Sequence, residues 1–263
     1  MTTTRVGLTG ALASEALEPL TKLLRAMADD ELILGYWDSE WTGIAPILEE
    51  DVAMSSLAQD EIGHARAYLG LLADLVDGDA DALAYDRDVD ELRHCRLLDH
   101  PRADWAATIA RRFLYDEADA VRLAALAGSS YRPLAELVAK IRREEVYHRL
   151  HAEAWLRRLA GSPGEARARL EAAWTALLPD AATVFTSLSG EETLVEAGVI
   201  GAPMAELEER WRAAIRPTCR ELGLAVPGPA TDPGRGRDDH GPAVAWLWNE
   251  ATIVRRLDPE AEW

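Results

Sequence analysis

Two tetrapeptides in this sequence, Glu61-Ile62-Gly63-His64 and Glu145-Val146-Tyr147-His148, share the pattern Glu-x-x-His. Residues three apart lie on the same face of an α-helix, so each tetrapeptide can direct a carboxylate and an imidazole at one point. A lone glutamate precedes each pair: Glu31 lies 30 residues before Glu61, and Glu117 lies 28 residues before Glu145. The order Glu, Glu-x-x-His, Glu, Glu-x-x-His is typical of a two-metal carboxylate site inside a four-helix bundle.

The charges of this ligand set can balance two divalent cations. Four carboxylates cancel four positive charges and two neutral imidazoles add none, which matters because buried charge without a partner is very costly. Mixed oxygen and imidazole donors suit iron or manganese better than a metal that prefers thiolates. We therefore expect two iron ions, with manganese as the alternative, because iron is the redox-active choice for oxygen chemistry. The predicted metal ligands and catalytic residues are Glu31, Glu61, His64, Glu117, Glu145 and His148.

A third Glu-x-x-His, Glu91-Leu92-Arg93-His94, follows a run of charged residues. We interpret it as a chance match, because no apolar face beside it is wide enough to bury a metal site. The alternative for all three is a set of Glu/His pairs on solvated helix faces. The doubled pattern, with nearly equal spacings on apolar helices, favours the metal site.

The composition indicates a helical protein. Hydrophobic residues make up 48% of the chain, and no window alternates with the period of a strand. The net charge of −18 argues against nucleic acid and against an anionic membrane surface as partners. No secretory signal, no apolar run of about 20 residues and no metal-type cysteine spacing is present, so we expect a cytoplasmic protein.

Apolar residues at helical spacing predict the elements that must position these side chains. The bundle helices are expected over residues 18–41, 46–77, 102–127 and 133–160. Residues 79–100 are a charged connection, expected to be the long crossover of the bundle. Helices are also expected over residues 163–178, from Ser189, over 203–222 and over 243–257, with capping boxes at Ser162 and Ser189 and a loop over 226–242.

We see no second core in this pattern. The prediction is one domain over residues 1–263, with a bundle core over about 18–160 and a helical extension over about 163–263. The extension is expected to wrap the bundle or to form a subunit interface.

Several neighbours of the six residues have predicted roles. Asp60 and Asp116 are candidate acceptors for the second N–H of a metal-bound imidazole. Gly35 either leaves room beside the metals or lets two helices approach closely, and His151 is expected to be an ordinary histidine. A substrate cavity is expected beside Gly35, Asp38, Tyr68 and Phe113.

The sequence resembles the C-subunit family of the bacterial ring-1,2-phenylacetyl-CoA epoxidase, the oxygenase of phenylacetate degradation. The likeness covers essentially the whole length, including the tail, which the metal motif alone would not require. The residues that carry it are Glu40-Trp41-Thr42-Gly43, Gly63-His64-Ala65-Arg66, Thr108-Ile109-Ala110-Arg111, Tyr147-His148, Trp155-Leu156-Arg157-Arg158-Leu159 and the end of the chain from His240-Gly241-Pro242 to Trp263.

This resemblance implies an all-α, ferritin-like four-helix bundle with additional C-terminal helices. It also implies a multicomponent enzyme that inserts one oxygen atom into the aromatic ring of a CoA thioester. In that family a sister A subunit carries the working di-iron site, and an electron-donating reductase with flavin and an iron–sulfur cluster serves it. The C subunit is a scaffold that often lacks a full ligand set, whereas all six positions are suitable here.

The motifs and the resemblance together leave three candidate functions for this protein. The first is a di-iron monooxygenase or oxygenase component that activates O2 for insertion into an aromatic or acyl-CoA-type substrate, in a homo- or hetero-oligomer. The alternative is a non-catalytic structural partner subunit of a multicomponent phenylacetyl-CoA oxygenase. Iron storage or peroxide removal ranks third, because the helices after residue 160 have no role in a simple ferritin cage.

Overall fold

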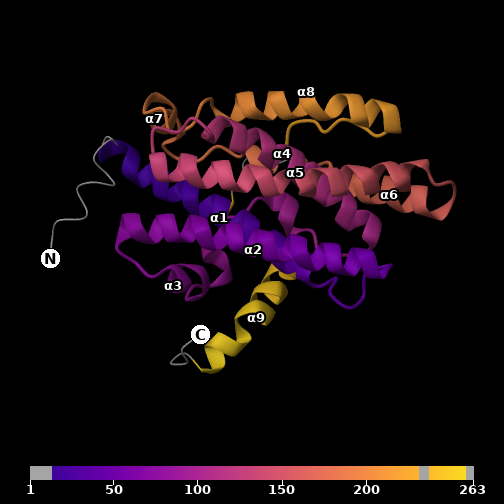
Figure 1. Ribbon diagram of the computed structural model, residues 1–263, viewed down its shortest axis with the longest axis horizontal. Helices are drawn as coiled ribbons and strands as arrows, with labels where there is room; N and C mark the ends of the chain where they lie inside the picture. Colours follow the sequence, from indigo (N-terminus) through magenta and orange to yellow (C-terminus); the bar gives the residue numbers. More distant parts are fainter. Residues whose placement is uncertain (1–13, 231–236, 259–263) are drawn as a thin grey trace.

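Four long helices form the body of the molecule (Figure 1). The computed structural model describes residues 14–230 and 237–258, which contain helices and no strand. The four bundle helices are α1 (Leu17–Ser39), α2 (Leu48–Val76), α4 (Trp105–Leu126) and α5 (Arg132–Gly161). Each begins and ends within three residues of its predicted range, and together they confirm the all-α, ferritin-like bundle.

The connections between these helices follow the predicted pattern of two pairs and one long crossover. Short loops join α1 to α2 and α4 to α5, whereas residues 77–104 cross from the first pair to the second. The crossover contains α3 (Ala80–Tyr85) and two 3-10 turns, η3 (Val89–Glu91) and η4 (Arg96–Asp99). Another turn, η2 (Ser14–Ala16), precedes α1. Side chains of Asp79 and Asp104 cap the starts of α3 and α4.

The helices after residue 161 extend the same core. They are α6 (Glu165–Leu177), η5 (Ala181–Phe185), α7 (Glu191–Glu196), α8 (Met204–Leu222) and α9 (Pro242–Leu257). Helices α6 and α8 pack on α4, and α9 contacts α1 from another side of the bundle (Figure 1). Their buried tryptophans, Trp174, Trp211 and Trp248, belong to one hydrophobic cluster with residues of α1 and α4.

The two predicted capping boxes are wrong. Helices α6 and α7 follow Gly164 and Gly190, which both have positive φ and offer no side-chain cap. The glycine conformation, rather than a serine hydroxyl, turns the chain into each helix. Residues 231–236 of the predicted loop lie outside the described part of the chain.

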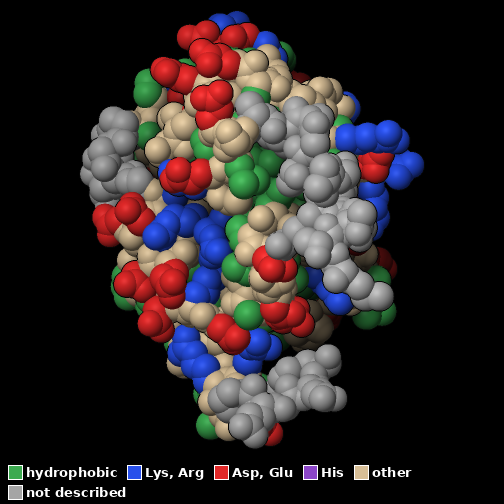
Figure 2. Space-filling model, turned by 90° about the vertical axis from the view of Figure 1, so that its left-hand side faces the viewer, with side chains coloured by type: hydrophobic (Ala, Val, Ile, Leu, Met, Phe, Trp, Pro, Cys, Tyr) green, Lys and Arg blue, Asp and Glu red, His purple; other side chains and the backbone are tan. Residues whose placement is uncertain are grey.

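Gly35 brings α1 and α2 into close contact. A Cβ atom at this position would lie 2.8 Å from Cγ1 of Ile62 and 3.1 Å from the carbonyl oxygen of Ala58. The close-approach interpretation is therefore confirmed, and the space beside Gly35 is filled rather than open. No helix within residues 14–230 and 237–258 is long and apolar enough to cross a membrane. One end of the molecule shows acidic and basic groups interspersed over its surface (Figure 2).

Candidate metal centre

Five of the six predicted ligands meet in the interior of the bundle. Helix α1 contributes Glu31, α2 contributes Glu61 and His64, and α5 contributes Glu145 and His148. None of the five is more than 4% exposed. One ligand atom from each of the first four lies within 4.8 Å of the others, which is a separation that a single cation can bridge.

The cluster has two halves, each built around one inward-facing imidazole nitrogen. In the first half, Nδ1 of His64 lies 3.4 Å from Oε2 of Glu31 and 3.6 Å from Oε2 of Glu61. In the second half, Nδ1 of His148 lies 3.2 Å from Oε1 of Glu61. Oε1 of Glu145 faces both nitrogens, at 3.7 Å from His64 and 2.9 Å from His148. Glu61 and Glu145 thus stand between the two halves, where bridging carboxylates would lie.

The outward-facing nitrogen of each imidazole has a carboxylate partner. Nε2 of His64 lies 2.9 Å from Oε2 of Glu144, and Nε2 of His148 lies 3.2 Å from Oδ2 of Asp60. Carboxylates in this position fix the ring and leave the other nitrogen free to bind a metal. Asp60 therefore has the predicted kind of role, but it serves the histidine of the other helix. Glu144 was missed, although an acidic residue precedes each Glu-x-x-His in the sequence.

The chemistry of the inward-facing atoms fits a cation. Buried atoms without a hydrogen-bond partner among the described residues include Oε2 of Glu31, Oε2 of Glu61 and Nδ1 of both His64 and His148. Buried polar atoms are normally satisfied, and orphaned ones call for an explanation such as a bound ion. Carboxylate oxygen and imidazole nitrogen are together a donor set for iron or manganese.

The pKa shifts show how strongly these groups interact. Burial and the neighbouring Glu61 raise the pKa of Glu31 well above its usual value. Burial also disfavours ionisation of Glu61, but the Arg112 guanidinium holds the pKa of that carboxyl well below the usual range. Burial opposes the charged form of His64, yet the carboxylates of Glu31 and Glu61 raise the pKa of its imidazole to about 11. The protein alone therefore keeps protons where a cation would otherwise balance the carboxylates.

The structure does not bring Glu117, the sixth predicted ligand, into the cluster. Its two oxygens accept hydrogen bonds of 2.8 and 2.9 Å from Nε and Nη2 of Arg149. The preceding residue, Asp116, is fully buried instead, and neither of its oxygens has a hydrogen-bond partner among the described residues. Burial raises the pKa of Asp116 well above its usual value, Arg112 opposes that shift, and the carboxylates of Glu145 and Glu61 add to it. Of these two neighbouring acids, Asp116 is therefore the fully buried one, and its carboxylate lies beside Arg112.

A buried arginine, Arg112, also reaches the centre, and the sequence analysis did not identify it. Its Nη1 donates to Oε1 of Glu61 at 2.5 Å and to Oδ2 of Asp38 at 3.0 Å. Its Nη2 lies 3.3 Å from Oδ1 of Asp116. Arg112 and Asp116 are one helical turn apart on α4, so this helix presents both a cation and an acid to the cluster.

Three consecutive acids on α1 hold different parts of the molecule. Asp29 accepts hydrogen bonds from Arg87 and from the backbone N–H of Arg93, both in the crossover. Asp30 accepts from Arg122 of α4 at 2.5 Å and from the backbone N–H of Cys95 at 2.7 Å. The third acid, Glu31, enters the cluster.

Tyr115 connects this buried network to the cluster. Its hydroxyl donates to Oε1 of Glu31 at 3.1 Å and accepts from Nη2 of Arg122 at 3.0 Å. Arg122 also donates to Oδ1 of Asp119 at 2.7 Å. A chain of buried hydrogen bonds through Tyr115 and Arg122 thus fixes the position of the Glu31 carboxylate. Hydrogen bonds that involve charged groups are stronger than those between neutral groups.

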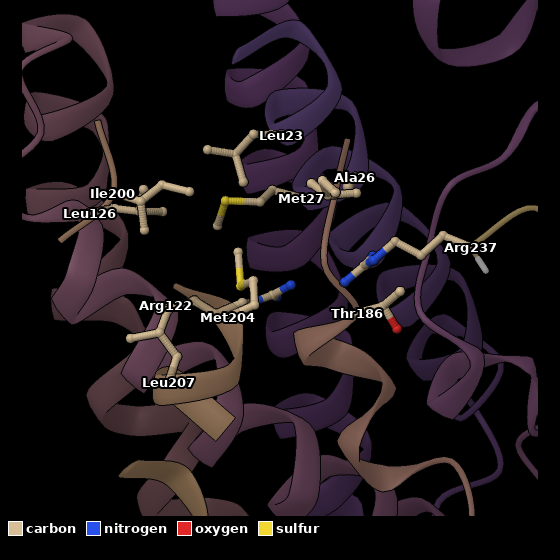
Figure 3. Close-up of a pocket in the computed structure, with 11 residues that line it drawn as sticks. Leu23, Ala26, Met27, Arg122, Leu126, Thr186, Ile200, Met204, Leu207 and Arg237 are labelled. Atoms are coloured by element: carbon tan, nitrogen blue, oxygen red, sulfur yellow. The ribbon is translucent and has the colours of Figure 1, made fainter. Parts of the chain in front are cut away.

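The C-terminal segment completes the network through Arg237. Its Nη1 donates to Oδ1 of Asp30 at 2.8 Å, and its Nη2 donates to the carbonyl of Val184 at 2.8 Å. Arg122 and Arg237 approach each other from opposite sides of a small apolar cavity of about 10 Å³ (Figure 3), which is room for about one water molecule. The cavity lies beside the ion network, and its lining includes Leu23, Met27, Leu126, Ile200 and Met204.

The third Glu-x-x-His does not act as a pair. The Glu91 carboxylate accepts a hydrogen bond from the backbone N–H of Asp88 and caps η3. His94 is fully buried, and its ring lies against that of His240 from the C-terminal segment. His94 Nε2 and His240 Nδ1 lie 2.8 and 3.0 Å from the same oxygen of Asp99.

The imidazoles of His94 and His240 stack, with ring centroids 3.8 Å apart and planes at 12°. A metal bound to both nitrogens would have to lie near both ring planes, which stacked rings do not allow. This group is therefore a hydrogen-bonded clamp that fastens the C-terminal segment to the crossover. Outside the centre, Nε2 of His151 lies 2.6 Å from Oε2 of Glu50.

Comparison with known proteins adds the family context. The family described as phenylacetic acid catabolic protein matches residues 8–263. The C subunit of the 1,2-phenylacetyl-CoA epoxidase of Escherichia coli (strain K12) is 28% identical over 249 residues, which cover 94% of this chain and 100% of that relative. The A subunit of the same enzyme is 26% identical over 208 residues, which cover 77% of this chain and 66% of that relative. These matches confirm the resemblance found in the sequence.

Proposed function

This chain belongs to the phenylacetic acid catabolic protein family, and we propose that it is a metal-binding oxygenase component of an enzyme of the phenylacetyl-CoA epoxidase type. One observation carries the proposal. Two histidines direct Nδ1 into a buried group of carboxylates, and each offers Nε2 to an outer carboxylate. This is the arrangement by which proteins hold a catalytic metal.

Iron is the metal that we propose for this centre, with manganese as the alternative. Glu31, Glu61, His64 and Glu145 would hold it in the first half, and His148 and Asp116 would complete the second. Bound iron would supply the electrons that reduce O2. The protein itself excludes water from the centre, fixes both imidazoles and sets the charge around the cluster.

Partners and substrate follow from the relatives. Both matched proteins are components of one epoxidase, so we propose a complex with a sister oxygenase component. An electron-donating reductase would serve each turnover, and the substrate would be a small aromatic molecule carried as a CoA thioester. The location that we propose is the cytoplasm.

Metal content and oxygen reactivity test the proposal together. The chain is expressed in iron-rich medium and its metals are measured by elemental analysis, beside the double variant Glu61→Ala/His64→Ala. We expect iron in the wild-type chain and its loss from the double variant. The exposed Glu136→Ala, on α5, is the control and should keep the metal. The reduced protein should then consume O2 faster than free iron at the same concentration.

The second candidate is a non-catalytic structural partner in the same kind of complex. It is favoured by the match along the whole length of the C subunit and by the buried arginine against Glu61. Under this alternative, wild-type protein and double variant would both lack metal, and a complex with the sister component would turn over equally well with either. That result would replace the oxygenase proposal.

A further inference from the structure

The two halves of the centre differ in what lies against their shared carboxylate. Oε2 of Glu61 faces the first half, at 3.6 Å from Nδ1 of His64, and has no hydrogen-bond partner among the described residues. Oε1 of Glu61 faces the second half, and there Nη1 of Arg112 donates to it at 2.5 Å. The same oxygen lies 3.2 Å from Nδ1 of His148. A guanidinium therefore sits where a ligand of the second half would meet its cation.

Arg112 is firmly placed in this position. Its side chain is fully buried between Asp38 on one side and Asp116 on the other. An arginine in a protein does not give up its proton, so the charge stays. A divalent ion bound to Oε1 of Glu61 at about 2.1 Å would lie less than about 5 Å from the nitrogen that donates to that oxygen. Two positive charges would then compete for one carboxylate oxygen.

We propose that Arg112 closes the second half of the centre, so that the isolated protein binds one divalent cation at Glu31, Glu61, His64 and Glu145. A second cation enters only when the guanidinium leaves Glu61. Asp38 remains available to hold the displaced guanidinium, because its Oδ2 already accepts a hydrogen bond from Nη1 of Arg112. Arg112 is thus a gate on the second metal position. The inference rests on the proposed metal function and deepens it.

Stoichiometry gives the first test. Wild-type protein, Arg112→Gln and Arg111→Gln are equilibrated anaerobically with ferrous ion by dialysis, and bound iron is measured by elemental analysis. Arg111 is the matched control because it is adjacent and equally buried, but it donates to the carbonyl of His100 and not to Glu61. We expect one ion per chain in the wild type and in Arg111→Gln, and two in Arg112→Gln.

A second pair of variants keeps the inference testable if Arg112→Gln does not fold. His64 and His148 occupy equivalent positions, one in each half. With Arg112 intact, His64→Ala should lose the bound ferrous ion, with affinity at least ~100-fold weaker, whereas His148→Ala should keep it within a few-fold. Circular dichroism and thermal melting confirm that both variants fold.

The outcomes separate this inference from the proposed function. Two ions in the wild type, or equal loss of the ion in both histidine variants, would overturn the gate and leave a metal-binding protein. The same single ion in Arg112→Gln as in Arg111→Gln would also overturn it. No ion in any of the proteins would overturn the gate and the metal function together.

Discussion

The two Glu-x-x-His segments share a sequence pattern but have different neighbours. Around His64, the carboxylate of Glu31 is backed by Tyr115 and by a buried ion network. Around His148, Arg112 already occupies the shared carboxylate. The α4 helix, which a symmetric pattern would equip with one more carboxylate, supplies an arginine as well as Asp116. Matching motifs therefore establish where ligands can lie, and the residues behind them determine whether a cation can reach them.

Breaking the buried ion network around Asp30, which lies next to Glu31 in the chain, should have the largest effect on stability. Asp30 is fully buried and accepts from Arg122, Arg237 and the backbone N–H of Cys95. Asp30→Asn would remove the carboxylate that the buried guanidinium groups of Arg122 and Arg237 share, and Arg122 would keep Asp119 as its partner. Removing one partner of a buried pair typically costs about 3–5 kcal/mol. We expect a loss of that size in the free energy of unfolding, measured by urea denaturation.

The control for Asp30→Asn is Glu136→Gln, which breaks an exposed pair with Arg132. Exposed pairs contribute about 0–1 kcal/mol, so this variant should unfold almost like the wild type. If Asp30→Asn were as stable as the control, the ion network would be no support for Glu31. The first half would then owe its geometry to packing alone.

Replacing each outer carboxylate by its amide tests whether the two halves of the centre contribute equally to metal binding. Glu144 and Asp60 are similarly exposed, with side-chain exposures of 35% and 38%, and each faces Nε2 of one histidine. Loss of such a partner typically weakens metal binding ~10–100-fold. Glu144→Gln should therefore lower the affinity for the first ferrous ion by that factor, because its partner His64 is the proposed histidine ligand of the first half. Asp60→Asn should change this affinity by no more than a few-fold.

Competition with a chelator of known affinity measures both constants. Equal weakening in the two variants would mean that His148 also holds the first ion, and the halves would be equivalent. A weakening in Asp60→Asn alone would place the first ion in the second half.

The sequence predicted the helices and most of the centre for one physical reason. Apolar stripes and the i, i+3 spacing are local, and a helix converts them directly into a face. Glu31, Glu61 and Glu145 each interrupt such a stripe, so their burial could be inferred without knowing the neighbouring helices. The outer pair Asp60 and Glu144 could also have been predicted, because each directly precedes a glutamate of the cluster.

The parts that were missed depend on contacts between distant segments. Arg112 looks like any polar residue of a helix, and its burial follows only from the meeting of α1, α2 and α4. Arg237 lies 207 residues from Asp30, and no periodic pattern announces such a pair. The burial of His94 likewise requires the C-terminal segment to fold back onto the crossover. The sequence analysis chose Glu117 rather than Asp116 as the α4 ligand. Neighbouring side chains are separated by only about 100° around the helix axis, so an apolar stripe does not decide which of the two faces the interior.

The choice between Asp116 and Glu117 as the metal ligand from α4 should produce the smallest change that these experiments measure. Glu117 pairs with Arg149, and the two side chains are 11% and 42% exposed, so Glu117→Gln should cost about 1–2 kcal/mol, between an exposed pair and a buried charged hydrogen bond. Its effect on metal is best measured in the Arg112→Gln background, where both halves are expected to fill. There, Glu117→Gln should keep two ferrous ions per chain, whereas Asp116→Asn should lose the second.

The two substitutions are matched, because each replaces one carboxylate by its amide on the same turn of α4. Loss of iron from the Glu117→Gln protein, with no loss from Asp116→Asn, would restore the ligand set predicted from the sequence. It would also mean that Arg149 releases Glu117 when metal binds. Retention of both ions in the two variants would leave the second half with Glu61, Glu145 and His148 alone, and α4 would then contribute the gate but no ligand.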